Sequence, residues 1–319
     1  MIRAAVVGCG DVSVVHLRAI ANLPGAALAG VCDTDPARTA ALPAPAFTDV
    51  DTLLRQVRPD VVHVCTPHDQ HVPVALAALD AGVAVLLEKP VAHTVAEAEK
   101  LIDAARQTHL PVGICLQNRY NATSRAAREL LRAGELGAVK GASATVLWHR
   151  DPAYYRARPW RGQRARSGGG VLINQAIHTL DLLEWILGDV ERIRGHAGRY
   201  ALDGIDVEDT ASVILDHAGG VRSVLFATVA HAVDSPVTIE IVTERATLLI
   251  RGDLTVRHAD GRVETVAEPA AAGGGRAYWG ASHELLIADF YRSLAGSEPF
   301  GIGPAEGARS LRLIQQLTS

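Results

Sequence analysis

The chain has 319 residues and a formal net charge of −4, and hydrophobic residues make up 48% of it against 21% charged. At roughly 150 residues per domain this length predicts about two domains. The apolar content excludes a largely disordered chain. The slightly acidic balance gives no reason to expect binding to nucleic acid or to an anionic membrane surface.

The cysteines and the apolar runs indicate the compartment. Cys9, Cys32, Cys65 and Cys115 lie far apart without CxxC or Cys/His metal spacing, so we expect buried thiols in a reducing compartment and no metal site. No apolar run reaches the roughly 18 residues that span a bilayer. The apolar start meets Asp11 at once, which favours a strand over a signal peptide. We therefore predict a cytoplasmic protein with no membrane partner.

The first 118 residues alternate short β-branched runs with Ala/Leu-rich segments of helical period. This alternation predicts βαβ units around a parallel sheet whose strands are buried on both faces. The expected strands are 2–7, 27–32, 61–65, 83–87 and 112–116, and the expected helices are 16–23, 53–57, 72–81 and 95–108.

The pattern changes after residue 118, which predicts domains at 1–118 and 119–319. Strand-like runs separated by turn residues indicate a mostly antiparallel sheet, and a small-residue linker is expected at 269–275. A polar, Arg-rich loop at 150–167 leads into an apolar helix. The expected strands are 139–149, 211–215, 221–230, 237–243, 246–250 and 254–258, and the expected helices are 123–133, 171–187, 283–294 and 304–317.

A glycine turn, GCGDVS at 8–13, follows the first strand and opens the first helix. Gly8 permits a tight turn, and Gly10 lets a pyrophosphate approach the backbone. Ser13 stands where a third glycine is usual and is small enough for close helix packing. The helix N-terminus, entered through Asp11 and Val12, presents free N–H groups to phosphates. This context predicts a dinucleotide site.

Asp33 ends the second strand, where a carboxylate can accept hydrogen bonds from the ribose hydroxyls and repel a 2′-phosphate. Arg38 lies close by in sequence and is able to pair with a phosphate instead. We predict NAD over NADP.

Lys89 directly follows the apolar run 83–87 and precedes Pro90, which biases its backbone to an extended conformation. It is therefore expected at the carboxyl edge of a parallel sheet, where ligands bind. A lysine there can donate a hydrogen bond to a substrate oxygen or exchange a proton.

The segment 168–181 contains three glycines and then Asn174, His178 and Asp181 at i, i+4 and i+7, on one face of an otherwise apolar helix. A polar stripe on a buried helix needs partners or a wet cleft, and the glycines allow a ligand or a backbone to come close. A core histidine satisfied by neighbours is the alternative interpretation of His178.

Four motifs follow one another along the chain: the glycine turn at 8–10, CTPH at 65–68, EKP at 88–90 and the segment 168–181. Together they resemble the glucose–fructose oxidoreductase, inositol 2-dehydrogenase and rhizopine-catabolism (Gfo/Idh/MocA) family, over essentially the whole chain. The resemblance implies an α/β fold: an N-terminal doubly wound Rossmann sheet and a C-terminal α/β domain with a large, mostly antiparallel open sheet. It also implies a homodimer or homotetramer formed through that sheet, and a final helix able to pack back on the first domain.

The resemblance further implies reversible NAD(P)-dependent oxidation of a hydroxyl on a sugar, sugar derivative or cyclitol, with Lys89 and His178 flanking that hydroxyl. The family often has aspartate where this sequence has Asn174, and an amide cannot carry a proton. We favour His178 as the acid/base and Lys89 as the group that polarises the oxygen; the opposite assignment stays open. The expected cofactor-binding set is Gly8, Gly10, Asp11, Val12, Ser13, Asp33, Arg38, Thr66, Pro67, His68, His71, Glu88, Lys89 and Gln117.

Aromatic rings and arginines suit a polyhydroxylated ring, including one that carries a phosphate, a carboxylate or a nucleotide. A basic loop that becomes ordered at a subunit contact is the alternative. The expected substrate contacts are Asn174, Arg119, Tyr120, Tyr155, Trp160 and Arg161.

These patterns predict an NAD-dependent sugar or cyclitol dehydrogenase. One alternative is a glycosidase of the same fold that acts through transient oxidation, and another is a non-catalytic dinucleotide sensor. The motifs do not identify the sugar or the carbon that reacts.

Overall fold

The computed structural model describes residues 1–269, 282–296 and 298–318. The chain divides into two compact units: unit 1 contains residues 1–117 and 283–311, and unit 2 contains residues 118–282 and 312–319. Residues 283–311, which we had grouped with the second domain, therefore cluster with the first unit. The linker expected at 269–275 lies outside the described residues from position 270 onward.

Unit 1 is built on a six-stranded parallel sheet, which confirms the predicted doubly wound fold. The strand order is β3-β2-β1-β4-β5-β6. Successive strands are added outward on one side of β1 up to β3 and then on its other side from β4 onward. This class of sheet binds ligands at that switch point, between β1 and β4. The strands are β1 (Ile2–Val7), β2 (Ala26–Cys32), β3 (Ala46–Phe47), β4 (Val61–Val64), β5 (Ala84–Glu88) and β6 (Val112–Cys115).

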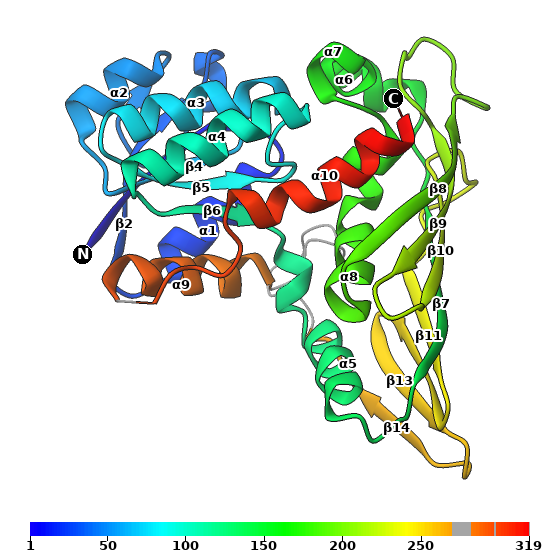
Figure 1. The fold of residues 1–319 in the computed structure, drawn as a ribbon. Helices are drawn as coiled ribbons and strands as arrows, with labels where there is room; N and C mark the ends of the chain where they lie inside the picture. Colours follow the sequence, from blue (N-terminus) through cyan, green and yellow to red (C-terminus); the bar gives the residue numbers. More distant parts are fainter. Residues whose placement is uncertain (270–281, 297, 319) are drawn as a thin grey trace. The chain divides into compact units, whose positions relative to one another are not determined.

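Helices cover both faces of this sheet, and Figure 1 shows α2, α3 and α4 on one face and α1 and α9 on the other. A side chain at Gly113 of β6 would come within 2.7 Å of the Phe290 ring, so glycine lets α9 pack closely on the sheet. The helices are α1 (Ser13–Asn22), α2 (Val50–Val57), α3 (His68–Asp80), α4 (Val95–Thr108), α9 (Ser282–Ala295) and the short 3-10 turn η1 (Pro36–Arg38).

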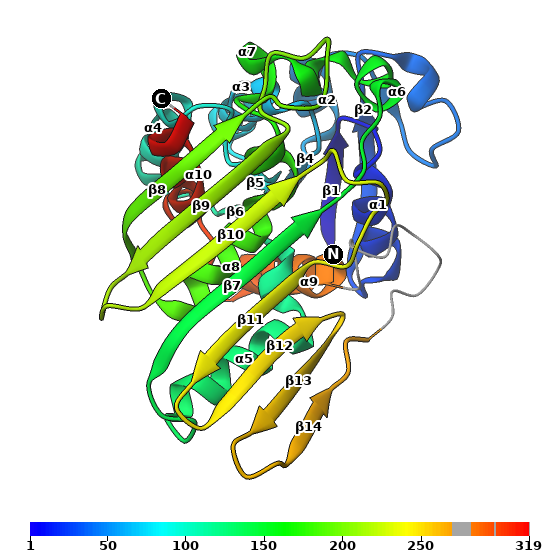
Figure 2. The same ribbon diagram turned by 90° about the vertical axis from the view of Figure 1, so that its right-hand side faces the viewer.

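Unit 2 contains an eight-stranded sheet in the order β14-β13-β12-β11-β7-β10-β9-β8, drawn face-on in Figure 2. Only the β7–β10 pair is parallel within it, so the expected mostly antiparallel sheet is confirmed. The strands are β7 (Val139–Leu147), β8 (Val190–Gly198), β9 (Thr210–His217), β10 (Arg222–Thr228), β11 (Thr238–Thr243), β12 (Ala246–Arg251), β13 (Asp253–His258) and β14 (Val263–Val266).

Two expectations for unit 2 are corrected. The Arg-rich stretch that we predict as a loop forms three short helices, and a proline begins each of the first two. The long apolar helix begins with a π-turn rather than as one continuous α-helix. The helices are η2 (Gln117–Tyr120), α5 (Ala122–Ala133), α6 (Pro152–Ala157), η3 (Pro159–Gly162), α7 (Arg164–Ser167), η4 (Leu172–Ala176), α8 (Ile177–Leu187) and, shared by both units, α10 (Pro304–Thr318).

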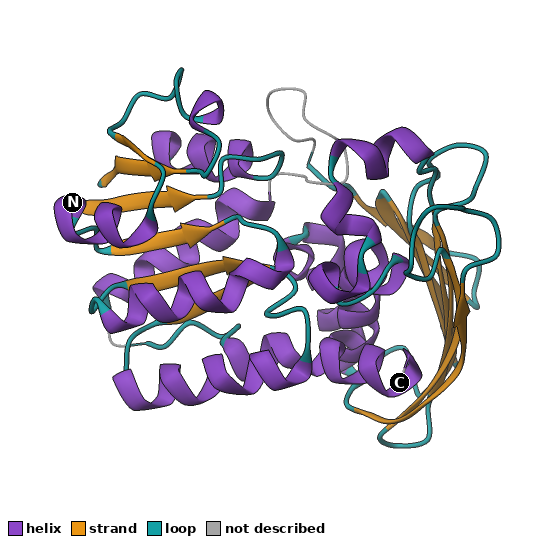
Figure 3. Cartoon of the chain, turned by 90° about the horizontal axis from the view of Figure 1, so that it is seen from above, coloured by secondary structure: helices purple, strands orange, loops and turns teal. Residues whose placement is uncertain are grey.

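The sheet of unit 2 has two unlike faces. Alternate residues of β9 and β10 are buried, and α5 packs against β12, β13 and β14. Seen edge-on in Figure 3, the helices of unit 2 lie on one side of this sheet. On the other face Val224, Phe226 and Val242 are each more than 40% exposed. A sheet face that exposes several large apolar side chains is available for another surface.

Among the helices of the described ranges, none combines the length and apolar character that a membrane crossing needs.

We predict that Phe290→Ala lowers the free energy of unfolding by about 3–5 kcal/mol, since this fully buried ring fills the contact between α9 and β6. Leu285→Ala is the matched control, because Leu285 lies on the same helix and is 51% exposed. It should change stability by less than about 1 kcal/mol in urea denaturation. Equal losses for the two variants would contradict the packing of α9 described above.

Candidate active site

Gly8 fixes the course of the glycine turn. Its φ is +88°, and a Cβ there would lie 2.6–2.7 Å from backbone atoms of Cys65 and Thr66. No side chain fits this approach, so only glycine lets the turn pass the end of β4. Gly10 differs, because the nearest atom to its would-be Cβ is Arg38 Nη1 at 4.0 Å. The space above Gly10 is what a pyrophosphate needs.

The first turn of α1 is arranged to receive an anion. Asp11 and Val12 form the turn that leads into the helix, and no side chain caps its start. The Ser13 hydroxyl donates to the Gly10 carbonyl (2.7 Å), and Ser13 is only 2% exposed. This small residue therefore fits where a larger one would separate the turn from the helix, and the helix N–H groups stay available.

Asp33 joins the end of β2 to the glycine turn. Its Oδ2 accepts the Cys9 backbone N–H (2.8 Å) and its Oδ1 accepts the Asp35 N–H (2.9 Å). Arg38 lies against both carboxylates, with Nη1 3.6 Å from Asp33 and Nε 3.4 Å from Asp35. The carboxylate thus stands beside the phosphate turn, the place expected for the group that binds the adenosine ribose.

The CTPH segment lies at the end of β4 and the start of α3. The Thr66 hydroxyl oxygen is buried and has no hydrogen-bond partner within the described ranges. Pro67 directly precedes α3 as its N-cap residue, and no side chain caps that helix. Because buried hydroxyls are normally satisfied, Thr66 fits a ligand group at this edge. Together with the open Gly10 and the uncapped α1, it shows that these residues fit a dinucleotide.

His68 and His71 lie next to one another on α3, with ring centroids 5.5 Å apart. His71 has Nδ1 2.7 Å from the Pro90 carbonyl and Nε2 3.0 Å from the Thr66 carbonyl. Burial lowers the pKa of His71, although the two carbonyl contacts oppose that change. His71 therefore holds the loops after β4 and β5 together.

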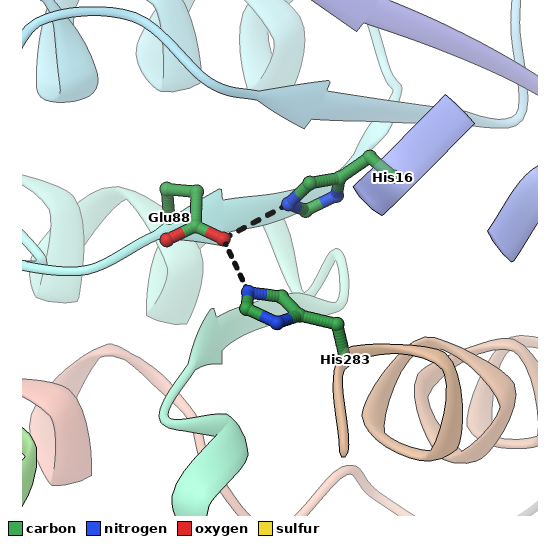
Figure 4. A group of neighbouring side chains, drawn as sticks. All are labelled: His16, Glu88 and His283. Carbon is green, nitrogen blue, oxygen red and sulfur yellow. Dashed lines mark hydrogen bonds and ion pairs between the residues drawn. The ribbon is translucent and has the colours of Figure 1, made fainter. Parts of the chain in front are cut away.

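Glu88 is the last residue of β5, and half-buried Lys89 follows it through a cis bond to Pro90. Figure 4 shows the Glu88 carboxylate between two imidazoles: Oε1 lies 2.9 Å from His16 Nε2 and 3.1 Å from His283 Nε2. Burial would raise the pKa of Glu88, but the hydrogen bonds from the two histidines hold it well below its usual range.

Sequence reasoning missed His16 and His283, and it also missed His63, another buried histidine of unit 1. His16 lies one turn into an apolar helix and His63 lies inside an apolar strand, and polar residues in such runs are themselves a sign of buried partners. His16, Glu88 and His283 also form a group whose ligand atoms lie within 4.8 Å of one another, close enough to hold a metal ion. Gln117, expected to bind the cofactor, is 3% exposed at the end of β6.

The predicted stripe on the apolar helix of unit 2 divides into two parts. Asn174 and His178 are partly exposed, whereas Asp181 is 1% exposed. Arg119, expected to contact substrate, instead makes a buried two-point ion pair with Asp181, with Nε–Oδ2 2.8 Å and Nη2–Oδ1 2.6 Å. This pairing favours a structural role for Arg119 and Asp181, and leaves Asn174 and His178 as the accessible polar pair.

The glycines before this helix meet protein backbone. Gly168 has a φ of +82° where it ends α7, and a Cβ at Gly170 would lie 1.8 Å from the Glu208 carbonyl oxygen. Glu208 accepts the Leu172 N–H at Oε1 (3.2 Å), and burial raises its pKa. The sequence predicted that a ligand or a backbone segment comes close to these glycines. In the structure the backbone of Glu208 does so, and the sequence did not reveal this partner.

Aromatic and arginine side chains contact one another in the short helices α6 and η3, which precede the apolar helix of unit 2. Arg161 lies over the rings of Tyr154 (4.6 Å) and Trp160 (5.5 Å), and the ring of Tyr155 lies edge-on to that of Tyr154 (5.1 Å). The Gln175 amide donates to the Tyr154 hydroxyl (3.4 Å), which ties this group to the apolar helix. Tyr154 was missed. Burial raises the pKa of Tyr155, and Tyr120, 8% exposed, lies under Arg125 (4.5 Å).

Comparison with known proteins places both parts of the chain. Residues 2–115 match the oxidoreductase family with an NAD-binding Rossmann fold, and residues 124–249 match the GFO/IDH/MocA C-terminal domain. The D-apiose dehydrogenase of Paraburkholderia graminis is 28% identical over 85% of this chain and 74% of its own length. The D-glucoside 3-dehydrogenase of Escherichia coli is 30% identical over 61% and 57%. The WlbA dehydrogenase of Bordetella pertussis, solved with NADH and UDP-GlcNAcA, has a TM-score of 0.86 and 28% identity, and the match covers 99% of this chain and 95% of that one.

We predict tighter binding of NADH than of NADPH, and we expect Asp33→Asn to weaken NADH binding by about tenfold and to narrow the preference. Asp35→Asn is the control, because this neighbour contacts Arg38 but not the glycine turn. Fluorescence titration at fixed ionic strength measures the affinities of the three proteins for NADH and for NADPH. A wild-type preference for NADPH would refute the role of Asp33.

The buried histidines predict a loss of stability in acid. Burial lowers the pKa of His16, His63 and His71 below the value of about 6.5 that applies to the unfolded chain. As the pH falls through 6.5, the unfolded state takes up protons that the folded state does not. Each histidine then costs up to about 1.4 kcal/mol of unfolding free energy per pH unit. Urea unfolding between pH 7.5 and 5.5 should show this slope. His71→Gln should reduce it, and the same change at exposed His196 should not.

Proposed function

Because this chain belongs to the Gfo/Idh/MocA family of NAD-binding oxidoreductases, we propose that it transfers a hydride between NAD and a hydroxyl-bearing carbon of a sugar, sugar derivative or cyclitol. The observation that carries this proposal is the sheet edge of unit 1. There the glycine turn, the uncapped start of α1 and Asp33 lie at the same sheet as β5, the strand that Lys89 directly follows. Parallel sheets gather such groups at their carboxyl ends.

NAD, when bound, supplies the hydride acceptor at nicotinamide C4. Lys89 donates a hydrogen bond to the reacting oxygen and polarises it. His178 accepts the hydroxyl proton during oxidation and returns it during reduction, a task that suits an imidazole whose ordinary pKa is near 6.5. Asn174 orients the substrate, since its amide cannot carry a proton. Asn174 and His178 are the accessible polar residues of their helix.

The ring-and-arginine group of unit 2 supports a polyhydroxylated substrate. Tyr154, Trp160 and Arg161 offer aromatic faces and a planar cation, which suit the C–H face and the oxygens of a sugar or of an attached anionic group. The named relatives include dehydrogenases of apiose and of glucosides. None of these names favours the glycosidase or the non-catalytic sensor.

A substrate screen tests the reaction class. We would incubate the protein with NAD and, in separate wells, D-apiose, D-glucose, methyl β-D-glucoside, myo-inositol and UDP-N-acetylglucosaminuronate, and follow NADH formation. We expect NADH with at least one member of the panel. Cleavage of an aryl glycoside without net NADH would instead favour the glycosidase mechanism.

Lys89→Met and His178→Ala should each lower kcat by about 10²-fold or more, the scale of general acid–base catalysis, with the dissociation constant for NADH unchanged within about twofold. Lys100→Met is the control for the lysine, because Lys100 is exposed on α4 and pairs with Glu97. If His178→Ala alone flattens the pH–rate profile, His178 is the proton carrier. If Lys89→Met alone flattens it, the roles are reversed.

The exposed face of the unit 2 sheet supports a homodimer or homotetramer. Val224 and Phe226 lie on β10, and on the neighbouring strand β7 their partners on the same face are Ser143 and Thr145. These small side chains allow a second sheet to approach closely. A face of this kind can pack against its own copy about a twofold axis.

We expect light scattering after size-exclusion chromatography to show an oligomer, and Phe226→Asp to convert it to monomer because a charge would be buried in the interface. Leu285→Asp, at an exposed apolar residue of unit 1, serves as control and should leave the oligomer intact. A wild-type monomer at high protein concentration would contradict the proposed assembly.

A cytoplasmic location is the last part of the proposal, and it is supported by the state of the cysteines. All four are free thiols, and Cys32, Cys65 and Cys115 are buried. A reducing compartment keeps thiols in this state.

A further inference from the structure

A chain of five side chains in unit 1 is buried, and none of them has a step in the reaction proposed above. Glu88, which was expected in the cofactor-binding set, has both carboxylate oxygens on protein donors. This chain of side chains runs from Tyr291 on α9 to His63 on β4, to His16 on α1 and to Glu88 on β5, where His283 of α9 joins it. His16 and His63 are fully buried, and the others are at most 7% exposed. Burying this many polar groups is costly unless each is satisfied.

Each hydrogen bond of the chain can be satisfied when His16 and His63 are both neutral. His16 donates from Nε2 to the Glu88 carboxylate, so its Nδ1 must accept from His63 Nδ1, 2.8 Å away. His63 Nε2 then accepts the Tyr291 hydroxyl proton at 2.8 Å. His283 donates from Nε2 to the same carboxylate oxygen. Glu88 is thus a buried carboxylate held by two imidazole donors.

A metal ion among His16, Glu88 and His283 is the competing interpretation. The two nitrogens lie 2.9 and 3.1 Å from Glu88 Oε1, which is hydrogen-bond distance. Ligands about 2.0–2.1 Å from a zinc ion would stand farther from one another than this, and such a site normally takes a fourth ligand. All three residues are buried. The geometry therefore favours hydrogen bonding.

The second oxygen of Glu88 points to a purpose for this group. Glu88 Oε2 accepts the backbone N–H of Lys89 at 3.2 Å. The carboxylate is held from α1 by His16 and from α9 by His283, and in turn it holds the amide of the lysine. Two successive hydrogen bonds therefore join helix α1 to Lys89, the residue that follows β5.

We propose that His16, Glu88 and His283 form a positioning cluster that fixes the backbone of Lys89 and joins it to helices α1 and α9. This inference rests on the proposed function for its kinetic consequence, since Lys89 matters to turnover only if it acts on the substrate. The cluster itself is not catalytic. It acts through Lys89.

Hydrogen exchange at the Lys89 amide tests the cluster without turnover. A glutamine at position 88 has one oxygen, so Glu88→Gln leaves without an acceptor either the Lys89 N–H or the imidazole N–H groups. His283→Gln removes one of the two imidazole donors that hold the carboxylate and leaves Glu88 in place. We expect the Lys89 amide to exchange about tenfold faster or more in both variants, with the Val85 amide of the same strand unchanged. Tyr291→Phe is the matched control, because it lies on the helix of His283 and loses only its contact with His63.

A double-mutant cycle tests whether the cluster acts through Lys89. With the substrate found in the screen, Glu88→Gln and His283→Gln should each lower kcat by about tenfold with KM for NAD unchanged, and Tyr291→Phe should not. In the Lys89→Met background the same changes should have no further effect, because the group they position is absent. Damage to the fold in general would lower kcat in both backgrounds.

The outcomes separate the two proposals. Unchanged exchange at Lys89 in both variants, or losses that add fully to that of Lys89→Met, would overturn the positioning cluster. So would one equivalent of bound metal in the purified wild-type protein by elemental analysis, lost in His283→Gln. Full activity of Lys89→Met would overturn the proposed function, and the exchange result would still decide whether the cluster fixes the lysine backbone. If Glu88→Gln fails to fold, amide exchange at Lys89 and kcat in His283→Gln alone decide whether the positioning cluster exists.

Discussion

The approach of the Gly8 backbone to the end of β4 is the constraint on which the rest of unit 1 depends. The would-be Cβ of Gly8 has backbone atoms of Cys65 and Thr66 within 2.7 Å, so no side chain can occupy it. The turn is therefore pressed against the sheet where its strand order reverses. Asp33 can bond the Cys9 N–H only because the turn lies there. The contact between Gly8 and the end of β4 thus fixes both the turn that binds phosphate and the place where Asp33 meets that turn.

Buried carboxylates are stabilised in different ways in the two units. Asp181 of unit 2 is neutralised by the Arg119 guanidinium in a two-point pair. Glu88 of unit 1 has imidazole donors instead and keeps its charge directly before Lys89 in the chain. A guanidinium at Glu88 would compete with the Lys89 N–H for the carboxylate. The two imidazoles bond to one oxygen, and the other oxygen accepts the N–H of the lysine backbone, as a positioning role requires.

The sequence was sufficient for features that depend on local pattern. The parallel strands were predictable because strands buried on both faces are continuous apolar runs, and the glycine turn and Lys89 were predictable from their places after such runs. Strand β8 was not, because VERIRGHAG lacks a long apolar run and alternates only weakly. The assignment of α9 to unit 1, the Arg119–Asp181 pair and the histidine chain all join residues distant in sequence. No spacing rule reveals them, and polar residues inside apolar segments were the only signal.

Asn174 shows how local geometry limits the chemistry open to the helix of unit 2. Its amide donates to the Gly169 carbonyl at 3.3 Å, in the π-turn that begins this helix. The wider turn breaks the regular helical spacing and marks many functional sites. An aspartate at this position would place a carboxylate oxygen against the Gly169 carbonyl oxygen, and two acceptors cannot form a hydrogen bond. The asparagine amide supplies the N–H donor that the carbonyl needs. The asparagine is thus explained by the turn that it stabilises. In the reaction that we propose, proton transfer therefore falls to His178 or to Lys89 and not to Asn174.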